Sequence, residues 1–158
     1  MSDVREIPGV SLNEDVGELV KKAEKWAETL YWLSSTQIRK LHNHITRIWN
    51  KYIYGEYSDR PEKFKELGEE IEFTKVFLTY QITRLVSSLE GEKRQLLKQF
   101  KEKMEKLFES VNNQETFERL KKFFDAFLAY HKFYSEFKKS EKKEGGMTDG
   151  RTQQKASR

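Results

Sequence analysis

Several residue types are absent or scarce in this chain of 158 residues, and each absence excludes a class of protein or site. There is no cysteine, which excludes disulfides, cysteine-ligated zinc and thiol catalysis. No apolar run approaches the roughly 20 residues that a membrane-spanning helix needs. The N-terminus lacks the basic stretch followed by an apolar one that marks a signal peptide. We therefore expect a cytoplasmic protein without a membrane partner.

Signatures of catalysis and of metal binding are absent as well. His42 and His44 are two positions apart, so on a helix they point about 200° away from each other and cannot share a metal ion. The sequence has no glycine-rich phosphate loop and no Gly-x-Ser-x-Gly motif. A cluster of five glutamates has no histidine nearby, and such a cluster is typical of a solvated helix face. It comprises Glu62, Glu66, Glu69, Glu70 and Glu72. We expect no enzymatic activity, no cofactor and no small-molecule substrate.

The pattern that is present is helical. Charged residues make up 35% of the chain, with only two prolines. Apolar residues recur at the helical period in five segments, at about 13–33, 34–54, 61–89, 93–111 and 114–139. Ser34 and Gln37 have capping-box spacing, and Gly91 is a natural helix terminator. The predicted fold class is all-α, a single bundle of about five helices over residues 13–139. We expect a flexible arm at 1–12 and a disordered basic tail at 140–158.

The segment 126–134, AFLAYHKFY, has apolar groups on nearly every side of a helix. A helix that is apolar all round must be buried by its neighbours. We therefore expect the last helix to be the central element of the core.

The net charge of +4 is concentrated at the C-terminal end. From Lys138 onward, seven basic and three acidic side chains account for all of it, so residues 1–137 are neutral as a whole. A nucleic-acid-binding surface in the folded part must therefore come from segregation of charge.

Residues 34–55 show such segregation, since they contain four cations and no acid. One stripe along this helix, about 16 Å long, carries four residues at positions i, i+4, i+7 and i+11. They are Lys40, His44, Arg47 and Lys51. Arg39 lies beside this stripe, and the apolar positions of the same helix lie elsewhere. An uncompensated cationic row suits a phosphate backbone, although an ordinary solvated face would show the same residues.

Two further groups of residues are candidates for the same role. Residues 73–89 contain no acid until the helix end and carry Lys75 and Arg84. The last helix offers Arg119, Lys121, Lys122 and Lys132. For each group a solvated face is the alternative. The tryptophans and tyrosines could stack on bases, but most of them occupy core positions of the helical pattern.

Three short motifs resemble the small helical subunit of the Csm-type (type III-A) CRISPR effector complex. They are STQIRK at residues 35–40, LTYQITR at 78–84 and FFDAFLAYHKFY at 123–134, in the order and spacing of that family. The chain departs from the family pattern at Thr79, at Thr83 and in the Ser-Glu pair after Tyr134.

The resemblance implies an all-helical, non-catalytic subunit that stacks in several copies beside the backbone subunit and lines the groove for target RNA. The implied partners are the backbone and large subunits, further copies of the chain, the guide RNA and single-stranded target RNA. Cleavage would come from the other subunits. The matching positions make five residues candidates for facing nucleic acid: Gln37, Arg39, Lys40, Gln81 and Arg84.

Two other functions remain open. A helical protein-protein interaction protein without nucleic-acid binding would explain the bundle and its mixed charges equally well, and it predicts a low 260/280 nm absorbance ratio on purification. A small subunit of a sister type III complex would share the function but have other partners.

Overall fold

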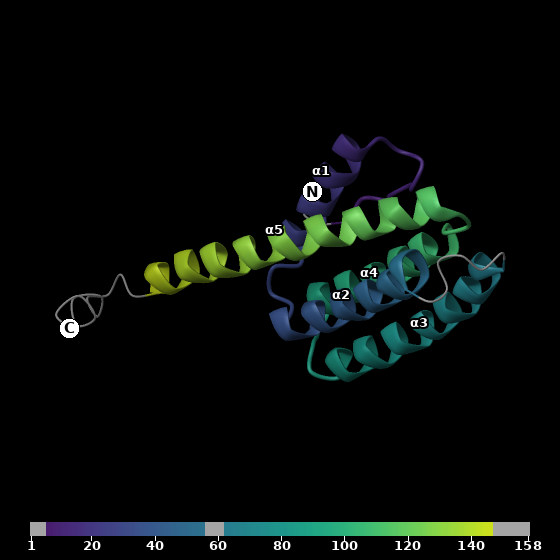
Figure 1. Cartoon of the computed structure of the whole chain (residues 1–158). Helices are drawn as coiled ribbons and strands as arrows, with labels where there is room; N and C mark the ends of the chain where they lie inside the picture. Colours follow the sequence, from purple (N-terminus) through teal and green to yellow (C-terminus); the bar gives the residue numbers. More distant parts are fainter. Residues whose placement is uncertain (1–5, 56–61, 147–158) are drawn as a thin grey trace.

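The computed structural model describes residues 6–55 and 62–146 of the chain. Five α-helices follow one another, and the described residues contain no strand, so the predicted all-α fold class is confirmed (Figure 1). The helices are α1 (Val16–Thr29), α2 (Ser35–Trp49), α3 (Lys63–Val86), α4 (Gly91–Glu109) and α5 (Gln114–Gly146). A π-helical turn, η1 (Asn50–Tyr54), extends α2.

Short polar side chains fix the helix starts. The carboxylate of Asp15 accepts the backbone N–H of Glu18 at 2.8 Å, and the hydroxyl of Ser34 accepts that of Gln37 at 3.4 Å, as the spacing predicted. Such caps satisfy amide groups that have no partner within the helix. Gly91 was predicted to end a helix, but it is the first residue of α4, with a φ of 63° that suits glycine.

The core is built around the first half of α5. Five of its apolar side chains are almost completely buried, and Trp26 of α1 meets Phe123 edge-on, with ring centroids 4.9 Å apart. The buried residues of α5 include Phe117, Leu120, Phe123, Phe124 and Phe127. The central position predicted for this helix therefore holds for its first half.

The second half of α5 differs from the prediction of burial on all sides. It runs past the ends of the other helices (Figure 1), and Phe133 and Phe137 are exposed. His131 stays buried because its Nε2 lies 3.1 Å from the carbonyl oxygen of Leu30. The helix also continues to Gly146, beyond its predicted end at 139. The rest of the predicted tail, 147–158, lies outside the described residues.

The segment that precedes α1 packs on the bundle. Ile7 and Leu12 are buried, and the backbone N–H of Ile7 donates to Oε1 of Gln99 at 3.0 Å. The indole N–H of Trp26 donates to the carbonyl oxygen of Pro8 at 2.8 Å. The described part of the predicted arm, residues 6–12, is therefore held in place because the bundle buries its apolar side chains. Residues 1–5 lie outside the described part.

Candidate nucleic-acid interface

Helix α2 lies between α3 and α5 (Figure 1). Its two histidines point to opposite sides. Nε2 of His42 lies 2.7 Å from Oδ1 of Asp125 on α5, and Nε2 of His44 lies 2.9 Å from Oγ1 of Thr74 on α3. The predicted divergence of the two rings is thus confirmed. The apolar side of α2 is buried, which leaves one side of the helix open to solvent.

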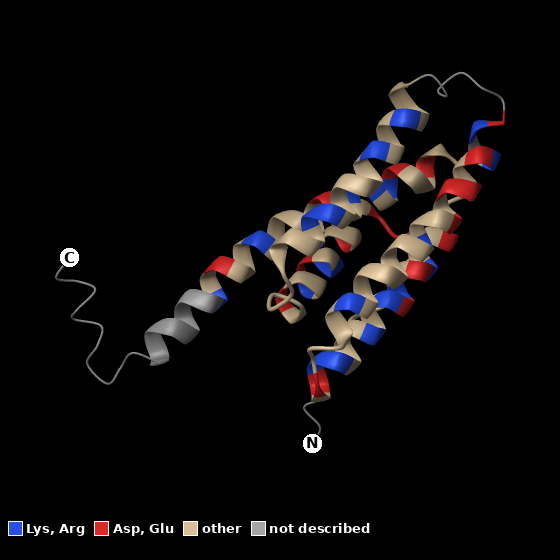
Figure 2. Ribbon diagram, turned by 90° about the horizontal axis from the view of Figure 1, so that it is seen from below, with Lys and Arg blue, Asp and Glu red and all other residues tan. Residues whose placement is uncertain are grey.

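That open side carries Arg39, Lys40 and Arg47, which we call the cationic face. All three side chains are exposed. Those of Arg39 and Lys40 make no hydrogen bond or ion pair with any described residue. Helix α2 contains no acidic residue, and in Figure 2 it is the helix with blue but no red bands that leads toward the grey segment 56–61. The cationic face is therefore uncompensated within its own helix.

Two members of the predicted stripe are turned toward α3. Lys51 lies in the π-helical turn, and its Nζ is 2.6 Å from Oε2 of Glu70. His44 stacks on Phe77, with centroids 4.6 Å apart and ring planes 8° apart. The row of four predicted from spacing is therefore shorter in the structure, and Arg47 is its last cation at this end.

Arg47 and His44 are joined by a hydrogen bond that defines the state of the imidazole. Nη2 of Arg47 lies 2.9 Å from Nδ1 of His44. Arginine can only donate, so Nδ1 accepts and Nε2 carries the proton that reaches Thr74. Burial lowers the pKa of His44, and the nearby charge of Arg47 lowers it further, while Glu70 acts in the opposite direction. His44 is therefore held neutral.

The two glutamines implied by the resemblance face the interior. Oε1 of Gln37 and Oε1 of Gln81 are both buried and have no hydrogen-bond partner among the described residues. Both residues line one enclosed cavity of about 20 Å³ between α2 and α3, a space that suits a single water molecule. The structure thus gives no support to these two as nucleic-acid-facing side chains.

The two cations of α3 have different surroundings. Lys75 bonds to Glu109 at 3.0 Å and to Glu72 at 3.2 Å, and the bond to Glu109 is the main reason why its pKa is raised. Lys75 therefore links α3 to α4, and the two carboxylates compensate its positive charge. Arg84 is exposed, and its guanidinium lies 5.8 Å from the centroid of the Tyr80 ring. Arg84 therefore remains a candidate.

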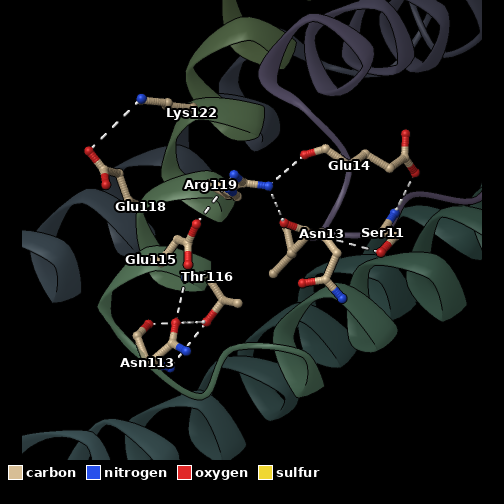
Figure 3. Close-up of polar contacts among 10 residues, drawn as sticks. Ser11, Asn13, Glu14, Asn113, Glu115, Thr116, Glu118, Arg119 and Lys122 are labelled. Carbon is tan, nitrogen blue, oxygen red and sulfur yellow. Dashed lines mark hydrogen bonds and ion pairs between the residues drawn. The ribbon is translucent and has the colours of Figure 1, made fainter.

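The candidates on α5 also separate. Arg119 donates from Nη1 to the carbonyl oxygens of Leu12 and Glu14, at 3.2 and 2.7 Å (Figure 3). Arg119 therefore holds the N-terminal segment against α5, and this structural role accounts for the residue without any contact to RNA. Lys122 is exposed and lies 3.9 Å from Glu118. Lys132 is exposed, with no side-chain partner in the described part of the chain.

One surface feature was missed by sequence reasoning. Phe73, Val76 and Tyr80 are 72%, 64% and 60% exposed along the outer side of α3. Their spacing of i, i+3 and i+7 was a visible signal, because it lies apart from the buried stripe of the same helix.

The described residues contain neither a cluster for a metal ion nor a helix suited to span a membrane. They contain no group of three or more histidine, aspartate or glutamate side chains placed to hold a metal ion. Among the helices that they form, none is long and apolar enough to cross a membrane.

Comparison with known proteins gives two related matches. The model of the family described as Csm2 Type III-A matches residues 13–137. A protein of Streptococcus thermophilus named CRISPR system Cms protein Csm2 is 29% identical over 105 residues, which cover 66% of this chain and 74% of the relative. No solved structure matches the chain.

Proposed function

The chain belongs to the Csm2 family of type III-A CRISPR systems, and we propose that it acts there as a non-catalytic small subunit that holds RNA by its phosphate backbone. The cationic face of α2 carries this proposal. Its three cations are exposed, and its helix has no acid to compensate them. Family membership accords with the resemblance of the three motifs.

The rigid mounting of α2 supports a role in positioning RNA. Its buried apolar side, the His42 contact with α5 and the His44 contact with α3 fix the helix on three sides. Cations on a fixed helix release counterions from phosphates without reading sequence. In an RNA-guided complex, base pairing with the guide supplies the specificity, and the protein contacts the backbone.

Self-association in copies agrees with the distribution of charge. Residues 1–137 carry no net charge, so neighbouring copies would not repel one another strongly. Each copy would extend the row of phosphate contacts by one cationic face. The proposed partners are the backbone and large subunits, further copies of the chain, the guide RNA and the target RNA.

Affinity purification of the tagged chain from its native cell tests this function. The expected co-purifying partners are a large subunit, backbone subunits and short guide RNAs. A variant with Arg39, Lys40 and Arg47 replaced by Ala should retain the protein partners but bring down less target RNA. A control variant removes the same charge from α1 and α4, at Lys21, Lys25 and Lys106, which are also exposed.

Two results would contradict the proposal. Recovery of unrelated proteins with no RNA would favour the interaction protein without nucleic-acid binding. Equal loss of RNA in the cationic-face variant and the control would mean that overall charge, rather than this face, determines binding.

A further inference from the structure

A groove between α3 and α4 has a cationic wall and an apolar floor. It has a volume of about 410 Å³, within the range of roughly 300–1,000 Å³ that is usual for small-ligand sites. Three of its lining residues are cations and none is an acid. The lining comprises Ile82, Thr83 and Val86 from α3 and Arg94, Gln95, Lys98 and Lys101 from α4.

Two of the three cations are available to a ligand. Lys98 is exposed, and its side chain has no hydrogen bond or ion pair with a described residue. Arg94 donates from Nη1 to the carbonyl oxygen of Val86 at 3.3 Å, which fixes the guanidinium and leaves most of its five N–H groups for other acceptors. Lys101 is compensated, because its Nζ lies 2.8 Å from Oε2 of Glu105.

An exposed aromatic ring stands beside the groove. Tyr80 lines a shallow hollow that shares Thr83 with the groove. Two acids, Glu72 and Glu105, also line this hollow, and they are paired with Lys75 and Lys101. Its ring is 60% exposed, and Arg84 lies 5.8 Å from its centroid. A ring that is open to solvent next to cations is the arrangement on which unpaired bases stack in single-strand-binding proteins.

The groove and the cationic face lie on either side of the same part of α3. Helices α2 and α3 are antiparallel, since Gln37 meets Gln81 at one cavity and His44 meets Thr74. This register places Lys40 near the level of Tyr80. The half of α3 that separates them, 73–89, carries no acid. A strand of RNA that crosses α3 between the cationic face and the groove therefore meets no acidic side chain from residues 73–89.

We propose that the groove between α3 and α4 binds an unpaired segment of RNA, with a base stacked on Tyr80 and phosphates bound by Arg94 and Lys98. The site extends the strand held by the cationic face and so rests on the function proposed above. It adds a preference for unpaired nucleotides, because only an unpaired base exposes a face to the tyrosine ring.

Fluorescence anisotropy on the full chain tests the site with two probes, a single-stranded RNA oligonucleotide and the same strand in a duplex. Tyr80→Leu keeps an apolar side chain and removes the ring, and Tyr80→Phe keeps the ring. The matched control is Phe137→Leu, which removes an exposed ring at the far end of α5. Lys98→Glu tests the phosphate contact, with Lys25→Glu on α1 as its control.

Tyr80→Leu should weaken binding of the single strand about tenfold, as loss of one stacked base does, and should leave duplex binding unchanged. Tyr80→Phe and Phe137→Leu should bind as the unaltered chain does. Lys98→Glu should weaken binding more than Lys25→Glu. Single-strand binding that is unchanged in Tyr80→Leu would overturn the site, as would a change in self-association alone.

The site and the proposed function can fail separately. If the variant lacking the cationic face binds RNA more weakly while Tyr80→Leu and Lys98→Glu do not, the groove is excluded and the function stands. If only the groove variants lose binding, the role of the cationic face is excluded.

Discussion

Arg47 donates a hydrogen bond from Nη2 to Nδ1 of His44 across 2.9 Å. His44 in turn donates a hydrogen bond from Nε2 to Oγ1 of Thr74 at 2.9 Å, so one neutral imidazole connects the cationic face to the contact between α2 and α3. The arrangement depends on His44 remaining neutral, because a protonated ring could not accept from arginine.

Acid should therefore destabilise the protein through His44. Burial holds its pKa below the ordinary 6.5, so its contribution to stability is fully present above pH 6.5 and is lost as pH falls through the lowered pKa. Thermal unfolding at pH 7.5 and at more acidic pH measures the loss. A His44→Asn variant should lose less stability than the unaltered chain on the same acidification. Equal losses would contradict the role of His44.

Arg119 should matter for stability and not for RNA. Its bonds to the carbonyl oxygens of Leu12 and Glu14 hold the N-terminal segment, and charged hydrogen bonds contribute about 1.5–3 kcal/mol each. Arg119→Ala removes both bonds and should lower the free energy of unfolding by about 3 kcal/mol in urea denaturation, with RNA affinity of the folded protein unchanged. Lys122→Ala, one turn from it and exposed, should stay within about 0.5 kcal/mol. An Arg119→Ala protein of normal stability but weak RNA binding would refute this assignment.

Two phenylalanines on α5 should respond in opposite ways to truncation. Phe127 is fully buried against Trp26, whereas the side chain of Phe133 is 49% exposed. Phe127→Ala should cost about 3–5 kcal/mol of unfolding free energy, from lost burial and the cavity that remains. Phe133→Ala should cost less than about 1 kcal/mol. Similar costs at both positions would mean that the second half of α5 is covered in solution.

The glutamine of the second family motif should be replaceable. Oε1 of Gln81 is buried without a partner among the described residues, in a cavity lined otherwise mainly by apolar side chains, so an apolar side chain of similar shape can replace it at little cost. Gln81→Met, of similar volume, should keep or raise the free energy of unfolding and leave RNA affinity intact. A clear loss of RNA affinity at normal stability would restore the nucleic-acid role that the resemblance implied.

Local patterns in the sequence predicted most of the fold. The cap at Ser34 and the apolar stripes depend on residues within one or two turns of each other, so the number and type of helices could be predicted. The burial of Ile7 could not, because its partner, Gln99, lies on α4.

The side chains of the candidate site were harder to predict, because their partners are distant in the sequence. Lys51 meets Glu70 on α3, and Arg119 meets the carbonyl oxygen of Glu14 on the segment before α1. A helical period shows which side of a helix a residue occupies, but it does not show which charge the neighbouring helix presents there. Arg39 and Lys40 remain candidates, because both side chains are exposed and have no partner among the described residues.

The salt dependence of RNA binding tests the central claim most directly. The logarithm of the affinity for single-stranded RNA should fall linearly with the logarithm of salt concentration, by about 0.7 for each phosphate contact. Replacing Arg39, Lys40 and Arg47 by Ala should reduce that slope by about two, while the control variant at Lys21, Lys25 and Lys106 should leave it largely unchanged. An unaltered slope in the cationic-face variant would contradict the claim that α2 holds the RNA backbone.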